Sequence, residues 1–182
     1  DADYYSKYLK FAEILPRLLG NPIYIWCALE LKRYFDIDQP LDPDNADEIY
    51  HQTKELIKKN QISPRWCMEK SKVEMVRTTE DPVDSLQYHV KMKEDPTLKT
   101  KILTAFRPDQ AFYCERDSFV EYVEKLSKTA EIKIDSFHSL LTALEKRLEF
   151  FREFGTNISD NGIADITWYD YTLDEVEMIF NK

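Results

Sequence analysis

Hydrophobic residues recur at helical spacing through the first third of the chain. They predict a helix over 5–19 that ends at Gly20, and a second helix that Asn21-Pro22 opens. Asn is a good helix cap, and Pro suits the first helical position. The same spacing predicts helices over 44–60 and 63–68. We therefore expect residues 1–70 to form a helical region.

The hydrophobic period changes after residue 71, where alternating positions predict strands between amphipathic helices. The expected strands are 72–79, 99–106 and 156–159, and the expected helices are 82–94, 117–130, 136–154 and 173–180. Strands that alternate with helices pair in parallel through right-handed crossovers. We therefore predict an α/β fold in which residues 71–182 form three parallel strands with helices outside them. Three such strands cannot close a barrel, so this segment is expected to be part of a larger β/α structure.

Charge and composition narrow the range of partners. A formal charge of -9, from 25 basic and 34 acidic residues, makes nucleic acid an unsuitable partner. No apolar run approaches the roughly 20 residues of a membrane helix, and no signal peptide is visible, so no membrane partner is expected. The three cysteines lie far apart, which favours thiols in a reducing, cytoplasmic compartment. Three glycines are too few for a Gly-rich phosphate loop.

Polar side chains follow each predicted strand, where β/α folds carry their reactive groups. They are Thr78, Thr79, Glu80 and Asp81 after the first strand, Arg107 and Asp109 after the second, and Ser159, Asp160 and Asn161 after the third. This set suits a polar or anionic small molecule, although no nucleophile–base pair is visible. We expect Arg107 either to bind an anionic ligand or to form an ion pair with Asp109. Asp81 precedes Pro82, so a helix cap is its simpler interpretation.

The spacing of histidines and cysteines does not indicate a metal site. His51, His89 and His138 lie on separate predicted helices, without H-x-H or H-x-x-x-H spacing. The cysteines lack C-x-x-C spacing. We therefore expect this chain to bind no metal or other cofactor by itself.

Four separated motifs resemble those of bacterial uronate (glucuronate) isomerases. Residues 20–35 (GNPIYIW…LELKRYF) are similar to that family's G-N-P-L-Y-H-W…L-E-L…F. Residues 78–89 (TTEDPVDSLQYH) are similar to its T-T-D-D-P-x-D-S-L-E-Y-H, and residues 106–112 (FRPDQAF) to its W/F-R-P-D-K-A-x. Residues 144–155, followed by 159–162 (SDNG), resemble its L-x-K-R-x-x-F-F…G…S-D-H segment. The order and spacing of the motifs hold across nearly the whole chain.

The resemblance implies a distorted (β/α)8 TIM-type barrel of the amidohydrolase superfamily with a helical N-terminal region, of which this chain matches a middle portion. It implies one divalent metal in the complete enzyme. It also implies aldose–ketose isomerisation of D-glucuronate to D-fructuronate, or of D-galacturonate to D-tagaturonate, in carbohydrate metabolism. Carried over by position, it implies that Arg107 binds the carboxylate of the uronate sugar and that Thr78, Glu80 and Asp81 bind substrate beside it. The catalytic residues are not assigned.

Three positions depart from the family's motifs and support an alternative. Ile25 stands where His is common, Glu80 replaces the first Asp of D-D-P, and Asn161 replaces the His of S-D-H. They favour a non-catalytic α/β binding or interaction module derived from that family. The aromatic residues of the helical region also allow a subunit interface, and hence a homo-oligomer. Family members are much longer, so this chain alone is expected to be inactive.

Overall fold

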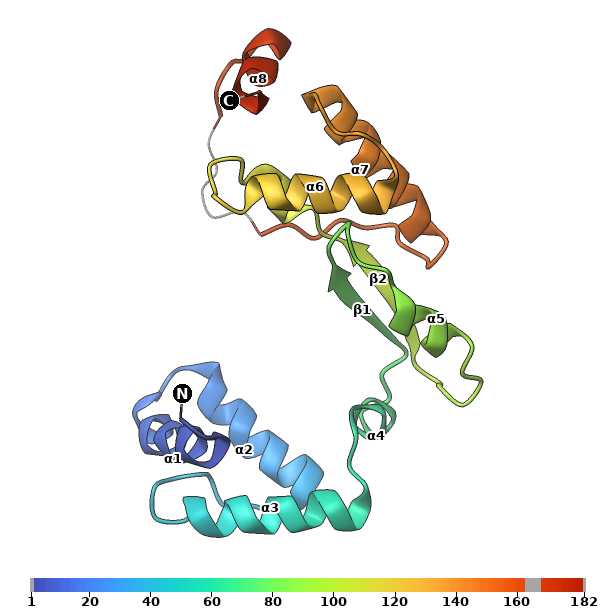
Figure 1. Ribbon diagram of the computed structural model, residues 1–182. Helices are drawn as coiled ribbons and strands as arrows, with labels where there is room; N and C mark the ends of the chain where they lie inside the picture. Colours follow the sequence, from blue (N-terminus) through green and yellow to red (C-terminus); the bar gives the residue numbers. More distant parts are fainter. Residues whose placement is uncertain (1, 163–167, 182) are drawn as a thin grey trace. The chain divides into compact units, whose positions relative to one another are not determined.

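The computed structural model describes residues 2–162 and 168–181. The chain divides into two compact units, Asp1–Lys72 and Val73–Lys182. Within the described residues the first unit contains helices alone, and the second contains a parallel strand pair with helices (Figure 1). Each unit has a hydrophobic core of its own. Among the helices described, none combines the length and apolar character needed to cross a membrane.

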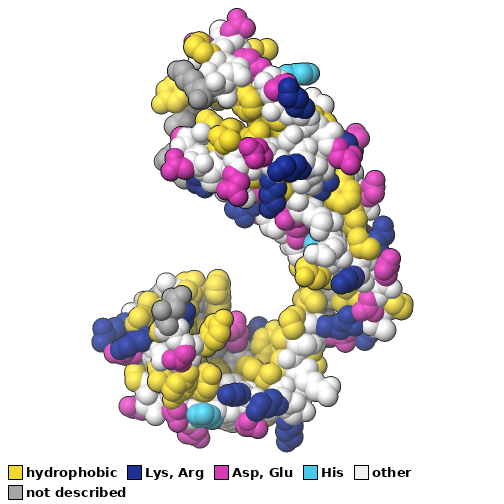
Figure 2. Space-filling model, in the orientation of Figure 1, with side chains coloured by type: hydrophobic (Ala, Val, Ile, Leu, Met, Phe, Trp, Pro, Cys, Tyr) yellow, Lys and Arg dark blue, Asp and Glu magenta, His cyan; other side chains and the backbone are white. Residues whose placement is uncertain are grey.

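The first unit packs α1 (Tyr4–Ile14), α2 (Pro22–Phe35) and α3 (Ala46–Asn60) around a small core, and α4 (Pro64–Lys70) follows them. Asp3, Asn21 and Ser63 each accept a hydrogen bond from a backbone N–H in the first turn of a helix, which caps α1, α2 and α4. The core consists of Ala12, Leu15, Ile37, Leu41, Ala46 and Ile49. Figure 2 shows other hydrophobic side chains at the surface of this unit, and Leu19, Ile25 and Trp26 are among the exposed ones.

The first helix is shorter than the sequence pattern predicts. It ends at Ile14, and Leu15–Arg17 form a 3-10 turn, η1, instead of continuing the helix to residue 19. Pro16 is the cause, because proline has no N–H to donate and its ring obstructs the preceding turn. Gly20 then reverses the chain with φ at +85°, a conformation that favours glycine.

The second unit is built on two parallel strands, β1 (Met75–Glu80) and β2 (Lys101–Phe106). Met75 pairs with Lys101 and Glu80 pairs with Phe106, so the carboxyl ends of the two strands lie side by side. The chain passes between them through α5 (Gln87–Lys93), which packs against β2. The parallel α/β arrangement predicted for these two strands is therefore confirmed.

The third predicted strand is wrong as a strand, because a single parallel bridge between Phe106 and Ser159 is all that forms in the described residues. The backbone N–H of Phe106 donates to the carbonyl of Ile158 at 3.2 Å. Further back along the same edge of β2, the carbonyl of Thr104 accepts from the Arg77 guanidinium at 3.1 Å. A side chain thus takes the carbonyl that a neighbouring strand would need, so pairing does not extend toward residue 156.

The helix predicted over 82–94 begins only at Gln87. Asp81 and Asp84 form a turn before it, in which the Asp81 carboxylate accepts from the Val83 N–H at 3.1 Å and the Asp84 carboxylate accepts from the Asp81 N–H at 2.9 Å. Such side-chain bonds to backbone compete with helix formation. Leu86 then adopts the left-handed conformation, with φ at +54°. Asp81 therefore caps a turn and not the start of a helix.

Two amphipathic helices, α6 (Phe119–Ala130) and α7 (Phe137–Arg152), pack against each other beside the strands. Their shared core consists of Tyr122, Leu126, Ala130, Leu140 and Ala143. A second cluster of Leu86, Phe106 and Phe151 joins α7 to β2. Thr172 and Glu175 form a capping box that starts α8 (Leu173–Phe180), a helix predicted over the same residues, and α8 packs on α7.

Arg147 fastens α7 to the turn that follows β1. Its Nε–H donates to the carbonyl of Pro82 at 2.6 Å, and its Nη2 donates to the carbonyl of Asp84 at 2.9 Å. The guanidinium also stacks on Phe150, 4.3 Å from the ring centre. The residue is 8% exposed, and burial lowers the pKa of its guanidinium. A buried cation whose donors are engaged holds its acceptors in place, so α7 fixes the turn over 81–84.

We expect Arg147→Met to lower the free energy of unfolding by about 2–4 kcal/mol, because two carbonyls lose a charged donor. Urea unfolding followed by circular dichroism measures the change. Lys146→Met is the matched control, since Lys146 is half exposed and pairs with a Glu131 carboxylate that is 84% exposed. Its loss should cost under about 1 kcal/mol. Equal unfolding midpoints for the two variants would contradict the role given to Arg147.

Candidate functional site

Polar side chains gather at the edge of the second unit where β1 and β2 end. The two strands end level with each other, and the bridge from Phe106 to Ser159 brings a third segment to the same edge. The sequence predicted this meeting from the strand ends, since the carboxyl ends of parallel strands share one edge. We call the following residues the strand-end cluster: Thr79, Asp81, Arg107, Asp109, Gln110, Tyr113, Asp160 and Gly162.

Arg107 is the only cation of the strand-end cluster. Its Nε–H donates to Asp109 Oδ2 at 2.7 Å, and its Nη1 lies 4.0 Å from Asp160 Oδ2. Its side chain is 40% exposed, whereas that of Asp109 is 17% exposed. The hydrogen bond from Arg107 to Asp109, together with the charge of that carboxylate, raises the pKa of the guanidinium, which stays a cation. The ion pair with Asp109 is therefore present, and it uses only the Nε side of Arg107.

Asp109 also holds the segment that follows Ser159. The same Oδ2 atom accepts the backbone N–H of Gly162 at 2.9 Å, and the carbonyl of Gly162 accepts from the Tyr113 hydroxyl at 2.9 Å. The other carboxylate oxygen, Oδ1, is buried and has no hydrogen-bond partner within residues 2–162 and 168–181. Thr79 Oγ1 donates to Asp160 Oδ2 at 3.2 Å. Three chain segments thus meet around one guanidinium.

Asp81 joins the turn after β1 to the turn after β2. Its Oδ1 accepts from the Val83 N–H and from the Tyr122 hydroxyl, each at 3.1 Å. Its Oδ2 accepts from Gln110 at 3.2 Å, and Gln110 lies in η2 (Asp109–Phe112). Burial raises the pKa of Asp81, and the three donors lower it in part. The pKa of Tyr122 is also raised, mainly by burial and also by the nearby charge of Asp81. Both oxygens of Asp81 are therefore engaged with the chain itself.

Thr78 and Glu80 lie on the opposite face of β1 from Thr79, because successive residues of a strand alternate. Thr78 Oγ1 donates to Glu80 Oε2 at 2.9 Å and lies 2.8 Å from Nε2 of His89 in α5. Glu80 Oε1 lies 3.5 Å from the same nitrogen. The structure thus brings Arg107 and Asp81 into the strand-end cluster and places Thr78 and Glu80 against α5. Strand alternation is the signal that could have selected Thr79.

The resemblance did not assign Gln110, Tyr122 or Gly162 to the site, yet each bonds to one of its carboxylates. Gln110 follows the R-P-D motif by one residue, so its place next to the site is readable from the sequence. Tyr122 lies in the buried face of α6, where periodicity indicates a core position. Gly162 ends the S-D-N-G run, and nothing in the run itself indicates contact with the R-P-D motif.

The described residues do not form a metal site by themselves. No group of three or more His, Cys, Asp or Glu side chains converges in the described part of the chain. His89 approaches one carboxylate, that of Glu80, and His51 approaches one, that of Asp47 at 3.6 Å. Catalytic zinc takes three protein ligands. The divalent metal that the resemblance implies therefore does not fit these residues alone.

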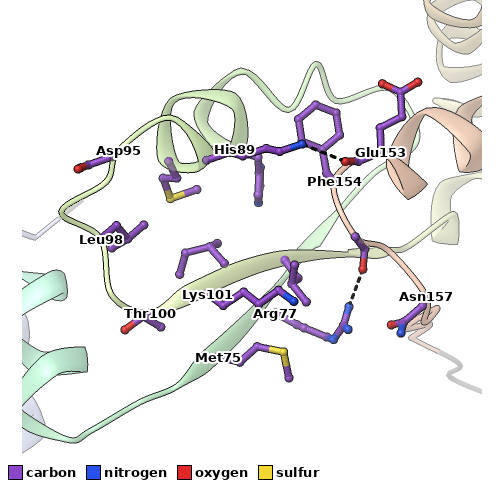
Figure 3. A pocket seen from close by; sticks show the side chains of 15 residues that line it. Met75, Arg77, His89, Asp95, Leu98, Thr100, Lys101, Glu153, Phe154 and Asn157 are labelled. Carbon is purple, nitrogen blue, oxygen red and sulfur yellow. Dashed lines mark hydrogen bonds between the residues drawn. The ribbon is translucent and has the colours of Figure 1, made fainter.

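A cavity of about 540 Å³ lies apart from the strand-end cluster, toward the amino ends of the strands (Figure 3). Met75 and Lys101, which begin β1 and β2, line it together with residues of α5 and of segment 153–157. Lys93 donates to the backbone carbonyl of Glu153 at 3.4 Å, and Arg77 donates to that of Gly155 at 3.5 Å; dashed lines in Figure 3 mark hydrogen bonds between residues that line the cavity. The cavity follows the part of the β2 edge that has no strand partner, so it is a gap beside the sheet.

Uronate isomerases are among the known proteins that match this chain. The family model for glucuronate isomerase matches residues 1–182. The uronate isomerase of Caldanaerobacter subterraneus subsp. tengcongensis is 41% identical over 182 residues, and that of Caldicellulosiruptor bescii is 43% identical over 182 residues. Each match covers 100% of this chain but 39% of the relative, so the chain spans well under half the length of these relatives.

Solved structures agree with the sequence matches. The crystal structure of uronate isomerase from Thermotoga maritima matches with a TM-score of 0.88 and 31% identity, covering 100% of this chain and 40% of that one. Glucuronate isomerase from Caulobacter crescentus matches with a TM-score of 0.87 and 26% identity, covering 100% of this chain and 38% of that one. Because the family model, the sequence identities and the fold agree over the whole chain, this chain belongs to the glucuronate isomerase family.

Proposed function

We propose that a protein containing this chain is a uronate isomerase, which converts an aldose uronate to its ketose. The substrate is D-glucuronate, giving D-fructuronate, or D-galacturonate, giving D-tagaturonate. Membership of the family over all 182 residues supports this function over a non-catalytic binding module. The single observation that carries it is a guanidinium at the carboxyl ends of parallel strands, bonded through Nε alone to the described residues.

We also propose that β1 and β2 are two strands of a distorted (β/α)8 barrel. Their parallel register and the crossover through α5 support this arrangement. In such barrels substrates bind at the carboxyl ends of the strands. The strand-end cluster lies at that end of β1 and β2, so we propose that it forms part of the substrate-binding site of the barrel.

Arg107 is the residue that we propose to bind the sugar carboxylate. A uronate differs from an ordinary aldose by this carboxylate, and a guanidinium binds carboxylates through two parallel hydrogen bonds. Asp109 uses the Nε–H, which leaves the edge formed by Nη1 and Nη2 for the substrate. Asp160 is the nearest other carboxylate, and at 4.0 Å from Nη1 it makes no hydrogen bond that would occupy this edge.

The other three residues that the resemblance assigned to substrate binding have different tasks in this proposal. Asp81 holds the turn after β2 through Gln110, and Thr78 and Glu80 hold α5 through His89. They shape the loops that face the substrate. Isomerisation moves a proton between neighbouring carbons and between their oxygens, which requires an acid–base group. None of the described residues of this chain is proposed as that acid–base group.

Arg107→Lys tests the carboxylate site, since it keeps a positive charge beside Asp109 but removes the planar fork. In a catalytically active protein that contains these 182 residues, we expect kcat/KM for the uronate to fall by roughly 10- to 100-fold, as for the loss of one charged hydrogen bond. Steady-state kinetics with D-glucuronate and D-galacturonate measure the change. The urea midpoint should stay close to that of the parent protein.

Arg152→Lys is the matched control for that experiment, because Arg152 is exposed at the end of α7. It should leave kcat/KM unchanged for both sugars. If Arg107→Lys also leaves kcat/KM within about twofold, Arg107 does not bind the substrate and its ion pair with Asp109 is its whole role.

A second prediction concerns metal. We expect the 182-residue chain, loaded with Zn²⁺ or Mn²⁺ and then dialysed exhaustively, to retain no stoichiometric metal, because the residues that the structure describes bring no three ligands together. Elemental analysis of the dialysed protein measures the content. One metal ion per chain would contradict this expectation and direct attention to His89 with Glu80 and His51 with Asp47.

A further inference from the structure

We propose that Asp109 and Gly162 are positioning residues that fix the orientation of the Arg107 guanidinium for a carboxylate-bearing ligand. The proposal deepens the role of Arg107 and rests on the proposed uronate-binding function. It concerns two residues that lie beside Arg107, and neither of them hydrogen-bonds to its Nη1 or Nη2 atom. Neither is proposed to touch the reacting atoms of the sugar.

Asp109 fixes the guanidinium at its Nε corner. The 2.7 Å hydrogen bond from Arg107 Nε to Asp109 Oδ2 is short and joins two charged groups, so it is among the stronger kinds in proteins. The guanidinium is planar, so a fixed Nε–H direction also fixes the directions of the four Nη hydrogens. Arg107 is 40% exposed, and without this bond its side chain could turn in solvent.

Position 162 requires glycine because neighbouring atoms leave no room for a side chain, and not because of its backbone conformation. A Cβ atom built on it would lie 2.7 Å from Arg107 Nη2 and 3.0 Å from Asp109 Oδ2. Gly20 and Gly155 are the described glycines with positive φ, and Gly162 is not one of them. Its missing side chain therefore serves close approach to the Arg107–Asp109 pair.

The backbone of Gly162 is held from both sides, so it cannot easily move away from Arg107. Its N–H donates to Asp109 Oδ2, and its carbonyl accepts from the Tyr113 hydroxyl, both at 2.9 Å. When a methyl group is added at position 162, the far end of the Arg107 side chain is the group that can move. The change would displace the guanidinium while the fold around it remains.

A contribution to the stability of the fold does not by itself explain why Asp109 has its carboxylate in this position. Its Oδ1 atom is buried without a hydrogen-bond donor in the described part of the chain, an arrangement that weakens a fold. The Oδ2 atom serves Arg107 and Gly162 at once. Asp109 therefore has one oxygen without a donor and one oxygen that accepts two hydrogen bonds. This arrangement is consistent with a carboxylate whose task is to orient Arg107.

Gly162→Ala and Gly20→Ala form a matched pair that separates positioning from stability. In a catalytically active protein that contains this chain, we expect Gly162→Ala to raise KM for D-glucuronate by about tenfold, with kcat changed less than about threefold and the urea midpoint unchanged. Gly20 has nothing within 4 Å of a built Cβ but has φ at +85°, so Gly20→Ala should lower the urea midpoint and leave KM unchanged. Equal KM values for Gly162→Ala and the parent protein would overturn the proposal.

Nitrogen-15 NMR of the 182-residue chain tests the same proposal without enzymatic activity. The Arg107 Nε–H signal should be protected from solvent exchange in the parent chain and in Gly20→Ala, and should lose that protection in Gly162→Ala and in the isosteric Asp109→Asn. Retained protection in both of these variants would overturn the proposal. If the parent protein converts no uronate, the proposed function fails, and the Nε–H signal alone then decides whether Asp109 and Gly162 position Arg107.

Discussion

The parallel register of β1 and β2 is the constraint on which the rest of the second unit depends. Glu80 pairs with Phe106, and the N–H of Arg107 still donates to the carbonyl of Glu80 at 2.9 Å, so the ladder continues to the residue that carries the guanidinium. A slip of two residues would move Arg107 by about 7 Å along β1. The bond between Gln110 and Asp81 and the contacts of Arg107 would then be lost together. Register thus fixes which polar groups meet.

Three of the sequence motifs that lie far apart along the chain are joined in one hydrogen-bonded network. Arg147, from the motif in α7, holds the Pro82 carbonyl of the T-T-E-D-P segment. Asp81, from that segment, is bonded to Gln110 of the R-P-D motif. Asp109, from the R-P-D motif, is bonded to Gly162 of the S-D-N-G segment, which adds the fourth stretch of chain. Each of these segments is therefore held in place by a hydrogen bond to another one, and α7 holds the turn that follows β1.

Local rules predicted those parts of the fold that depend on local chemistry. The helix cap at Asn21 and the alternating pattern of β1 and β2 follow from residues within a few positions of each other. The prediction of a third strand over 156–159 was wrong because Arg77, some 80 residues earlier in the sequence, donates to the Thr104 carbonyl. That carbonyl lies on the edge of β2 where the third strand would pair. At the site, strand ends predicted the meeting of Arg107 with Asp109 and Asp160. The closeness of Gly162 to Arg107 could not be predicted, because it depends on the long-range hydrogen bond from the Gly162 N–H to Asp109.

The two interpretations of Arg107 that the sequence left open are compatible once the geometry is known. An ion pair through Nη1 and Nη2 would have used the edge that recognises a carboxylate, and the two roles would then exclude each other. The bond to Asp109 runs through Nε, so it occupies one corner of the guanidinium, and no residue that the structure describes accepts a hydrogen bond from Nη1 or Nη2. A lysine has no planar fork, so it could not bind Asp109 through one corner and present a separate flat edge to a carboxylate. The same ion pair that has a structural role is therefore also the contact that we propose to orient the guanidinium. The absence of a side chain at Gly162 leaves room for the pair to lie close to a third segment of the chain.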